Sequence, residues 1–255
     1  DGYVIASQAD KMLKGIKDFF GALPKESASI YSTAMSSQSY SSVTPEGFVY
    51  IPILNPSKWS GSIEKRKVIY NLASGSFSLA ATPTWDAATI LTSGKFTDGS
   101  AAVAWNARKV FTYSLEPSKV GGQAFSVANK SNLDSAVVAA LNTNPADNTA
   151  DAQADARINF ILGDRSNEKK TDGTGIFRPR SSLMGDVVSS GPVYKKEPDS
   201  LVDSGYATFM ARTDVKARRP VVYTGANDGM LHAFDADNGK ELFAYIPRAV
   251  AENLN

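Results

Sequence analysis

Residues 220–247 read Pro-Val-Val-Tyr-Thr-Gly-Ala-Asn-Asp-Gly-Met-Leu-His-Ala-Phe-Asp-Ala-Asp-Asn-Gly-Lys-Glu-Leu-Phe-Ala-Tyr-Ile-Pro. Three short apolar runs lie in this stretch, at Val221–Thr224, Met230–Asp235 and Leu242–Ile246. Compact turns join them, and the second contains Asn238-Gly239, a pair that favours a type I′ turn because both central residues need positive φ. The pattern predicts three consecutive antiparallel strands, the repeating unit of a β-propeller blade.

A single blade cannot bury both of its faces, and propellers need about four to eight blades. We therefore expect the chain to be a fragment of a longer protein, with a propeller truncated at Asn255. The blade is expected to expose an apolar face, to pair with another chain or to pack onto residues 47–180.

Further motifs occur in a fixed order upstream of the blade. They are Trp59-Ser-Gly61, Trp85-Asp-Ala87, Leu162-Gly-Asp-Arg-Ser-Asn-Glu168, Phe177-Arg-Pro-Arg180 and Leu183-Met-Gly-Asp-Val-Val-Ser-Ser-Gly-Pro-Val193. Together with residues 220–247, these motifs resemble the PilC/PilY family of type IV pilus tip adhesins and pilus-biogenesis factors. The match is dense from about Leu162 to Pro247 and looser from Gly47 to Phe111.

The resemblance implies a mainly β fold with a few helices, in which a β-domain precedes the start of a quinoprotein-like β-propeller. It implies a non-enzymatic protein that acts at the pilus tip in assembly, control of retraction, twitching motility and adhesion. Such a protein is exported, through the periplasm, to the bacterial surface, where its partners are minor pilins and a host-cell or surface receptor. The family's calcium-binding loop lies in a later blade, so calcium is expected only in the parent protein and no cofactor in this fragment.

The sequence divides into four expected regions. Residues 1–26 form a helix after a capping box at Ser7, and in this family such a helix resembles the tail of a von Willebrand A-like domain. Residues 27–45 are a Ser-rich linker, residues 46–180 a β-rich domain with two helices, and residues 181–255 the first part of the propeller. Within the β-rich domain, strands are expected at Phe48–Leu54, Val68–Leu72, Ser76–Leu79 and Lys109–Ser114, and helices at 133–141 (after a capping box at Ser131–Asp134) and 151–162.

Composition excludes several classes of function. Lys and Arg number 27 against 26 Asp and Glu, so the chain lacks the basic excess of a nucleic-acid binder. The short basic cluster at Lys65-Arg-Lys67 is expected in solvent. No Cys is present, which excludes thiolate metal sites, disulfides and a thiol nucleophile. No apolar run approaches the ~20 residues of a membrane-spanning helix.

Few residues are candidates for chemistry. The single histidine, His232, shares a strand face with Met230 and Phe234 and is interpreted as a packing residue, with Asp228 in the preceding turn as another structural or partner candidate. Trp59 and Trp85 are expected to pack in the core or between domains, with sugar stacking as the alternative. Asp164 and Arg165 are expected to pair or to cap strand ends where two domains meet.

The segment 235–241 is a candidate calcium loop, with Asp235, Asp237, Asn238 and Glu241 as oxygen donors. Its glycine comes one residue too early for an EF-hand, so a plain hairpin turn is favoured. Two other functions remain open. The blade pattern also resembles quinone-dependent dehydrogenases, and the tryptophans allow a carbohydrate-binding surface module. No phosphate loop or nucleophile elbow is present, so no catalysis is expected in this fragment.

Overall fold

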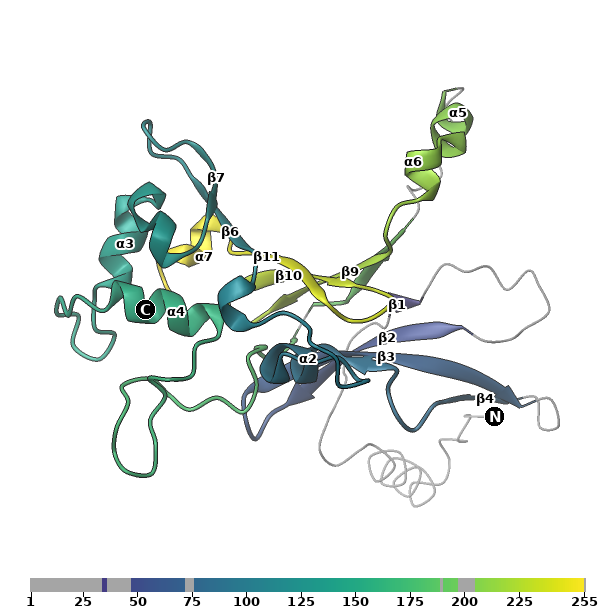
Figure 1. Ribbon diagram of the computed structural model, residues 1–255, viewed down its shortest axis with the longest axis horizontal. Coiled ribbons are helices and arrows are strands. Elements are labelled where there is room, and N and C mark those ends of the chain that lie inside the picture. Colours follow the sequence, from purple (N-terminus) through teal and green to yellow (C-terminus); the bar gives the residue numbers. More distant parts are fainter. Residues whose placement is uncertain (1–33, 36–46, 72–75, 189, 197–204, 255) are drawn as a thin grey trace, which may run out of the picture.

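The computed structural model describes residues 34–35, 47–71, 76–188, 190–196 and 205–254 (Figure 1). Two β-sheets with short helices around them make up this part of the chain, so the expected fold class, mainly β with a few helices, is confirmed. The helix expected in residues 1–26 lies outside the described residues. The Ser-rich segment 27–45 does too, except for residues 34–35.

The first sheet is antiparallel and has the strand order β1 (Ala34–Met35), β2 (Phe48–Asn55), β3 (Ser60–Asn71) and β4 (Ser76–Leu79). A short strand, β5 (Trp85–Asp86), also pairs with β3. The strand expected at 68–72 is only the end of the long strand β3. Its first half escaped prediction because the charged run Glu64–Lys67 interrupts the apolar alternation.

Lys65 corrects the expectation that the basic cluster is solvated. This lysine is buried in the middle of β3, and its Nζ donates to the carbonyl of Ala236 at 2.9 Å. The side chains of Tyr50 and Trp85 donate to the same carbonyl, at 3.3 and 3.1 Å. Three donors from the first sheet therefore hold the turn that contains Ala236.

A helix that the sequence analysis missed, α2 (Ala87–Ser93), follows β5. It begins where the Asp86 carboxylate accepts a hydrogen bond from the backbone N–H of Thr89 at 2.6 Å, and it ends at Gly94 with φ of 66°. The helix packs Ile90 and Leu91 against the first sheet.

The second sheet contains the predicted blade. Its strand order is β7 (Gly121–Ala124), β6 (Val110–Ser114), β11 (Glu241–Tyr245), β10 (Met230–Asp235), β9 (Val221–Ala226) and β8 (Val193–Lys195). The antiparallel meander β9–β10–β11 is confirmed, and β6 joins it through a parallel pairing with β11. Strands from before residue 180 thus continue the same sheet, so the boundary expected there does not separate two sheets.

The turn between β10 and β11 differs from the predicted type I′ turn. Among the described residues, those with positive φ other than glycine are Trp59, Asn148 and Ala152, so Asn238 lacks the conformation that this turn requires. A longer loop is closed instead by Gly239, with φ of 76°, whose N–H donates to the Asp235 carbonyl. A Cβ on Gly239 would lie 2.8 Å from the Trp85 ring, so the turn follows its packing against the first sheet.

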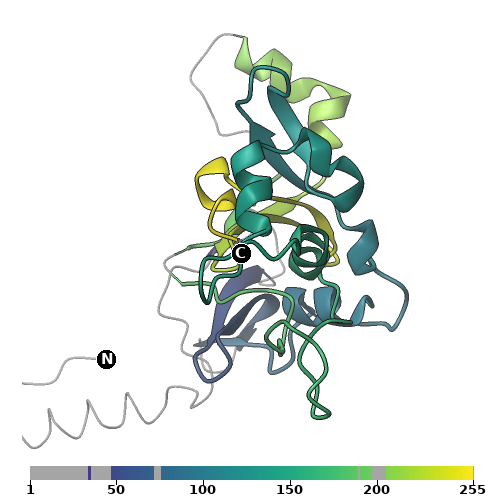
Figure 2. The same ribbon diagram turned by 90° about the vertical axis from the view of Figure 1, so that its left-hand side faces the viewer.

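Short helices cover one end of the second sheet. They are η1 (Trp105–Ala107), η2 (Val127–Asn132), α3 (Ser135–Leu141), α4 (Ala154–Leu162) and α7 (Arg248–Ala251). The two predicted helices are confirmed as α3 and α4. The expected capping box at Ser131 is wrong, because α3 begins after Asp134, whose carboxylate binds Ser114 and Arg248 instead. In Figure 2 the C-terminal end of the chain lies beside this helical layer, with the first sheet below it.

Between β8 and β9 the chain forms two further short helices, α5 (Tyr206–Ala211) and α6 (Thr213–Lys216). They project away from the two sheets in Figure 1.

One face of the blade is covered by upstream residues. Packing onto residues 47–180 was one of the three outcomes expected from the sequence. Val222 and Phe234 pack with the first sheet and α2, while Met230 and Ala244 pack with α3 and α4. The opposite face carries Leu231 beside Tyr245 and Phe111, and both Leu231 and Phe111 are exposed. The blade therefore both packs onto residues 47–180 and presents apolar side chains on its other face.

Candidate functional site

The three-residue loop between β9 and β10 is docked onto the segment 183–187. Asp228 in this loop accepts hydrogen bonds from the backbone N–H groups of Gly185 (2.9 Å) and Met230 (3.1 Å). Asn227 donates through its side chain to the carboxylate of Asp186 at 2.8 Å. A Cβ on Gly185 would lie 2.4 Å from the backbone nitrogen of Asp228, so only glycine permits this close approach.

Behind Asp228 lies a buried chain of alternating charges. His232 on β10 contacts the Asp228 carboxylate through Nε2 (3.0 Å) and the Glu241 carboxylate through Nδ1 (2.8 Å). Arg108, which precedes β6, pairs with both oxygens of Glu241 at 2.6 and 2.8 Å. The side chains of His232, Glu241 and Arg108 are 0%, 1% and 1% exposed.

This network joins three layers of the molecule. Arg108 also donates to the carbonyl of Leu162, the last residue of α4, at 2.8 Å. His232 and Glu241 lie on adjacent strands of the blade, and Asp228 reaches segment 183–187 through Gly185. The paired charges therefore connect the blade to the helical layer and to the segment that leads into it.

The pKa values of the network follow from competition between burial and pairing. Burial alone would lower the pKa of His232, but the charges and hydrogen bonds of Asp228 and Glu241 outweigh it and raise this pKa to about 9. Burial would raise the pKa of Glu241, but Arg108 and His232 lower it to about 2. At neutral pH the histidine is therefore protonated and is fully occupied by two carboxylates.

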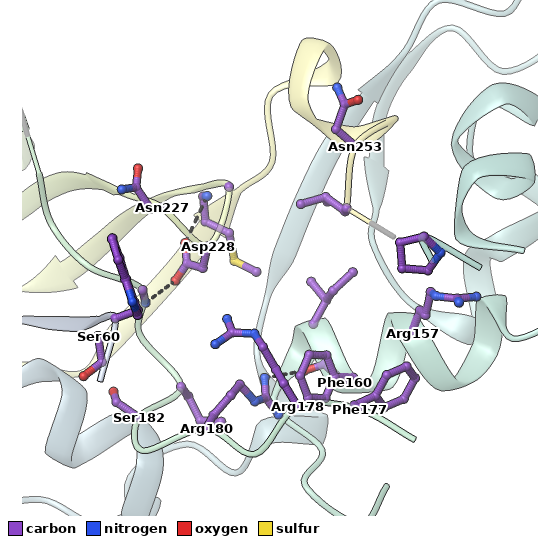
Figure 3. A pocket seen from close by; sticks show the side chains of 18 of the residues that line it. Ser60, Arg157, Phe160, Phe177, Arg178, Arg180, Ser182, Asn227, Asp228 and Asn253 are labelled. Carbon is purple, nitrogen blue, oxygen red and sulfur yellow. Dashed lines mark hydrogen bonds between the residues drawn. The ribbon is translucent and has the colours of Figure 1, made fainter. Parts of the chain in front are cut away.

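In front of the β9–β10 loop lies a pocket of about 920 Å³ (Figure 3). Its walls come from the β2–β3 turn, helix α4 with the loop before it, the segment 169–185, the β9–β10 loop and the C-terminal residues 250–254. Asp228 thus faces the pocket on one side and the buried network on the other.

The pocket walls are held by ion pairs. Arg157 binds Asp151 through two hydrogen bonds of 2.8 and 2.6 Å. Glu168 accepts from the side chains of Arg180 (2.8 Å) and Arg165 (3.1 Å), and Arg180 lies over the ring of Phe160 at 3.7 Å. Arg178 has no such partner among the residues that the structure describes, and in Figure 3 its side chain extends into the space between α4 and the β9–β10 loop.

The structure separates the two tryptophans. Trp85 is 2% exposed and lies in the core, where its ring packs at a tilt against the ring of Tyr50. The expectation of core packing is wrong for Trp59, which is 73% exposed at the tip of the β2–β3 hairpin and lines the pocket. The turn places Trp59 in the left-handed region, with φ of 46°, a conformation that is uncommon for residues other than glycine.

The expected oxygen donors around residues 235–241 do not come together. Asp235 accepts from the backbone N–H of Asp237, Asn238 accepts from that of Lys240, and Glu241 is buried against Arg108. In the part of the chain that the structure describes, no group of three or more His, Asp or Glu side chains could hold a metal ion.

Asp164 and Arg165 do not pair with each other. The Asp164 carboxylate accepts from the backbone N–H and hydroxyl of Ser166 at 2.8 and 3.0 Å, whereas Arg165 binds Glu168. Neither residue lines the pocket, but both contact residues that hold Arg180 in its wall: the Arg180 guanidinium donates to the Asp164 carbonyl at 2.9 Å, and Arg165 shares Glu168 with Arg180.

Sequence reasoning missed Arg108, Arg178 and the pairing role of Glu241. A lone arginine between two predicted strands carries no recognisable signal, because its partner lies more than a hundred residues away in the sequence. The alternation Met230, His232, Phe234 was a usable clue, because it places the histidine on a buried face of the strand. A buried histidine needs polar or charged partners.

Comparisons with known proteins show which family the region around this site resembles. The family model described as PilY1 beta-propeller domain matches residues 184–254. A Type IV pilus biogenesis factor PilY1 homolog from Xylella fastidiosa is 48% identical over 115 residues, which are 42% of this chain and 9% of that protein. The Type IV pilus biogenesis factor PilY1 of Pseudomonas aeruginosa strain PAK is 43% identical over 126 residues, which are 45% of this chain and 10% of that protein.

The chain thus spans about a tenth of the length of these curated relatives. No solved structure matches the chain significantly. None of the helices in the described residues is long and apolar enough to span a bilayer. The resemblance seen in the sequence is confirmed: residues 184–254 match the family model of the PilY1 beta-propeller domain, and about half of the chain is similar to type IV pilus biogenesis factors.

Proposed function

We propose that this chain is part of an exported protein that acts at the tip of the type IV pilus, in pilus assembly, control of retraction and surface adhesion. The observation that carries the proposal is the match of residues 184–254 to the PilY1 β-propeller family. Relatives that are 43–48% identical are named type IV pilus biogenesis factors, which supports the same assignment.

Within that protein, residues 47–254 act without catalysis, as a junction that fixes the first blade to the upstream region. The buried network supports this role, because it links the blade, α4 and segment 183–187 through paired charges. A catalytic histidine would need an acceptor site free for the substrate's proton, whereas both ring nitrogens of His232 are bound to carboxylates. Buried ion pairs of this kind specify geometry more than they stabilise.

The partners of this region are minor pilins and, on the outside, a surface receptor. Near-zero net charge, 27 basic against 26 acidic residues, favours contacts through particular patches over long-range attraction. The pocket beside the β9–β10 loop is the candidate patch in the described residues, since it combines charged and apolar side chains.

Deletion of the gene, followed by complementation, tests the proposal. We expect fewer surface pili, reduced twitching and fewer adherent cells, with recovery by the wild-type gene. A Glu241→Gln gene should recover less, because the variant leaves Arg108 without its carboxylate. Unchanged piliation together with unchanged adherence would reject the pilus function and favour a quinone-dependent dehydrogenase, tested by dye reduction with added pyrroloquinoline quinone.

A carbohydrate-binding module is the second candidate function, because the exposed Trp59 offers a flat ring at the rim of the pocket. A glycan array probed with the purified chain and with Trp59→Ala tests it. Trp59-dependent binding to neutral sugars would support this candidate, and equal signals from both proteins would reject it.

A further inference from the structure

The charges that line the pocket do not balance. Its walls present five basic residues and two acidic ones, Asp151 and Asp228. Both acids are already neutralised, Asp151 by Arg157 and Asp228 by the protonated His232. The basic residues are Lys58, Arg157, Lys169, Arg178 and Arg180.

Three of those cations have no counter-charge. Arg157 pairs with Asp151 and Arg180 with Glu168, but within the described residues Lys58, Lys169 and Arg178 form no ion pair. The chain as a whole is nearly neutral, so this local excess does not follow from composition. Burial is the main cause that lowers the pKa of Arg180 in spite of Glu168, and the neighbouring charges of Arg165 and Arg178 act in the same direction.

The same pocket has an ordered apolar side. The ring of Phe160 lies between the Arg180 guanidinium, at 3.7 Å, and the ring of Phe177, at 4.6 Å. Ile176 beside them is 53% exposed, and the rim residue Trp59 is exposed too. An exposed tryptophan held in a left-handed turn conformation is an unusual use of a large apolar residue, and such residues often anchor protein interfaces.

These two properties together define the ligand. Free cations attract carboxylates, and the adjacent aromatic and aliphatic side chains bury apolar groups. A small inorganic anion would leave the apolar side uncovered, and a neutral sugar would leave the cations unpaired. A polypeptide that alternates acidic and apolar side chains satisfies both, and the pocket volume lies in the range of ~300–1,000 Å³ typical of binding pockets.

We propose that this pocket binds an acidic, partly apolar segment of another protein, with Lys58, Lys169 and Arg178 pairing with its carboxylates and Trp59 and Ile176 covering its apolar side chains. This proposal names a class of ligand for the pocket, which the proposed function does not. It can hold whether or not the chain acts at a pilus. Binding is measured in vitro, so failure of the pocket and failure of the pilus assignment give different results.

The test uses the purified 255-residue chain and a fluorescein-labelled peptide of repeated Glu-Leu-Asp-Phe-Ser sequence. The matched peptide carries Gln and Asn in place of Glu and Asp. Fluorescence anisotropy should show binding of the acidic peptide and at least about tenfold weaker binding of the amide peptide, with weakening by salt. Because Trp59 is exposed, its emission should also shift when the unlabelled peptide binds.

Variants locate the binding. Lys58→Gln, Lys169→Gln and Arg178→Gln combined should weaken binding about tenfold, and Ile176→Ser should weaken it several-fold. The control combines Lys95→Gln, Lys109→Gln and Lys216→Gln, which removes the same charge from exposed residues that do not line the pocket. This control should bind like the wild type.

Absence of binding to the acidic peptide overturns the proposal. Equal weakening by the pocket and control triples also overturns it, since attraction would then be non-specific. Binding to a sulfated oligosaccharide that survives competition with the acidic peptide would assign the pocket to anionic glycans instead. Circular dichroism of each variant identifies any loss of binding that results from unfolding.

Discussion

Two sets of charged side chains lie on opposite sides of the β9–β10 loop, and they differ in burial and in ion pairing. Behind the loop, Arg108, Glu241 and His232 are buried and paired. In front of it, Lys58, Lys169 and Arg178 line a pocket without counter-charges in the described residues. The contrast indicates that one set holds the junction between the blade and the upstream layers, while the other is available to a partner.

The largest effect should come from breaking the buried set. Glu241→Ala removes the carboxylate shared by Arg108 and His232 and leaves the guanidinium of Arg108 buried without a counter-charge. Loss of one partner from a buried pair costs about 3–5 kcal/mol, so urea denaturation should show a loss of this size.

The control for that variant is Asp214→Ala, which removes an exposed pair with Arg212. It should leave the unfolding midpoint unchanged, because exposed pairs contribute little. If both variants changed the free energy of unfolding equally, the distinction between the two sets would fail.

The pH dependence of stability should report the same network. The pKa of His232 is raised from 6.5 to about 9, so its contribution is complete below pH 6.5 and is lost as the pH rises through 9. The loss is about 3 kcal/mol for a shift of this size. Glu241, with its pKa lowered from 4.5 to about 2, contributes above pH 4.5 and loses its contribution as the pH falls through 2.

Urea denaturation at a series of pH values measures this dependence, and NMR can follow the ring of the chain's single histidine directly. A His232→Asn variant should show a flatter profile between pH 6.5 and 9. A histidine that titrates near its ordinary value in the folded wild type would contradict the account.

A change in the pocket wall should lower the free energy of unfolding by less than a change in the buried network does. Glu168→Gln weakens the bonds from Arg165 and Arg180 and the bond from the backbone N–H of Arg180. Hydrogen bonds to charged groups contribute about 1.5–3 kcal/mol, so the free energy of unfolding should fall by about 2 kcal/mol. The exposed variant Asp172→Asn serves as the control, and a larger change in the control would speak against the role of Glu168.

The smallest effect on stability should come from the pocket cations. Lys58→Gln, Lys169→Gln and Arg178→Gln, made singly, should each change the free energy of unfolding by less than about 0.5 kcal/mol, because each side chain lacks an ion-pair partner among the described residues. Thermal denaturation checks this expectation. A clear destabilisation by any of them would mean that the side chain has a structural partner.

The sequence predicted best where local patterns decide the structure. The meander of β9–β11 follows from alternating apolar residues between glycine-containing turns, and α3 and α4 follow from helical spacing. The family motif around residues 183–193 and 220–247 predicted the propeller segment, which the family match confirms.

Long-range contacts decided what the sequence could not predict. The turn at Gly239 adapts to Trp85, and Lys65 is buried because Ala236 offers its carbonyl across the interface. Arg108 and Glu241 lie 133 residues apart, so no local pattern could pair them. Trp59 differs from Lys65 in the opposite direction. A large aromatic side chain favours burial, but the position of Trp59 at a hairpin tip leaves it in solvent.

A double-mutant cycle between Arg108 and Glu241 measures how strongly this buried pair holds the blade to its upstream layers. Arg108→Met, Glu241→Leu and the double variant would be compared with the wild type by urea denaturation at neutral pH. We expect a coupling of about 2 kcal/mol or more, with the double variant more stable than the Glu241→Leu variant, because that single change leaves Arg108 buried and unpaired. Losses that add within about 0.5 kcal/mol would contradict the claim that paired buried charges hold the blade to its upstream layers.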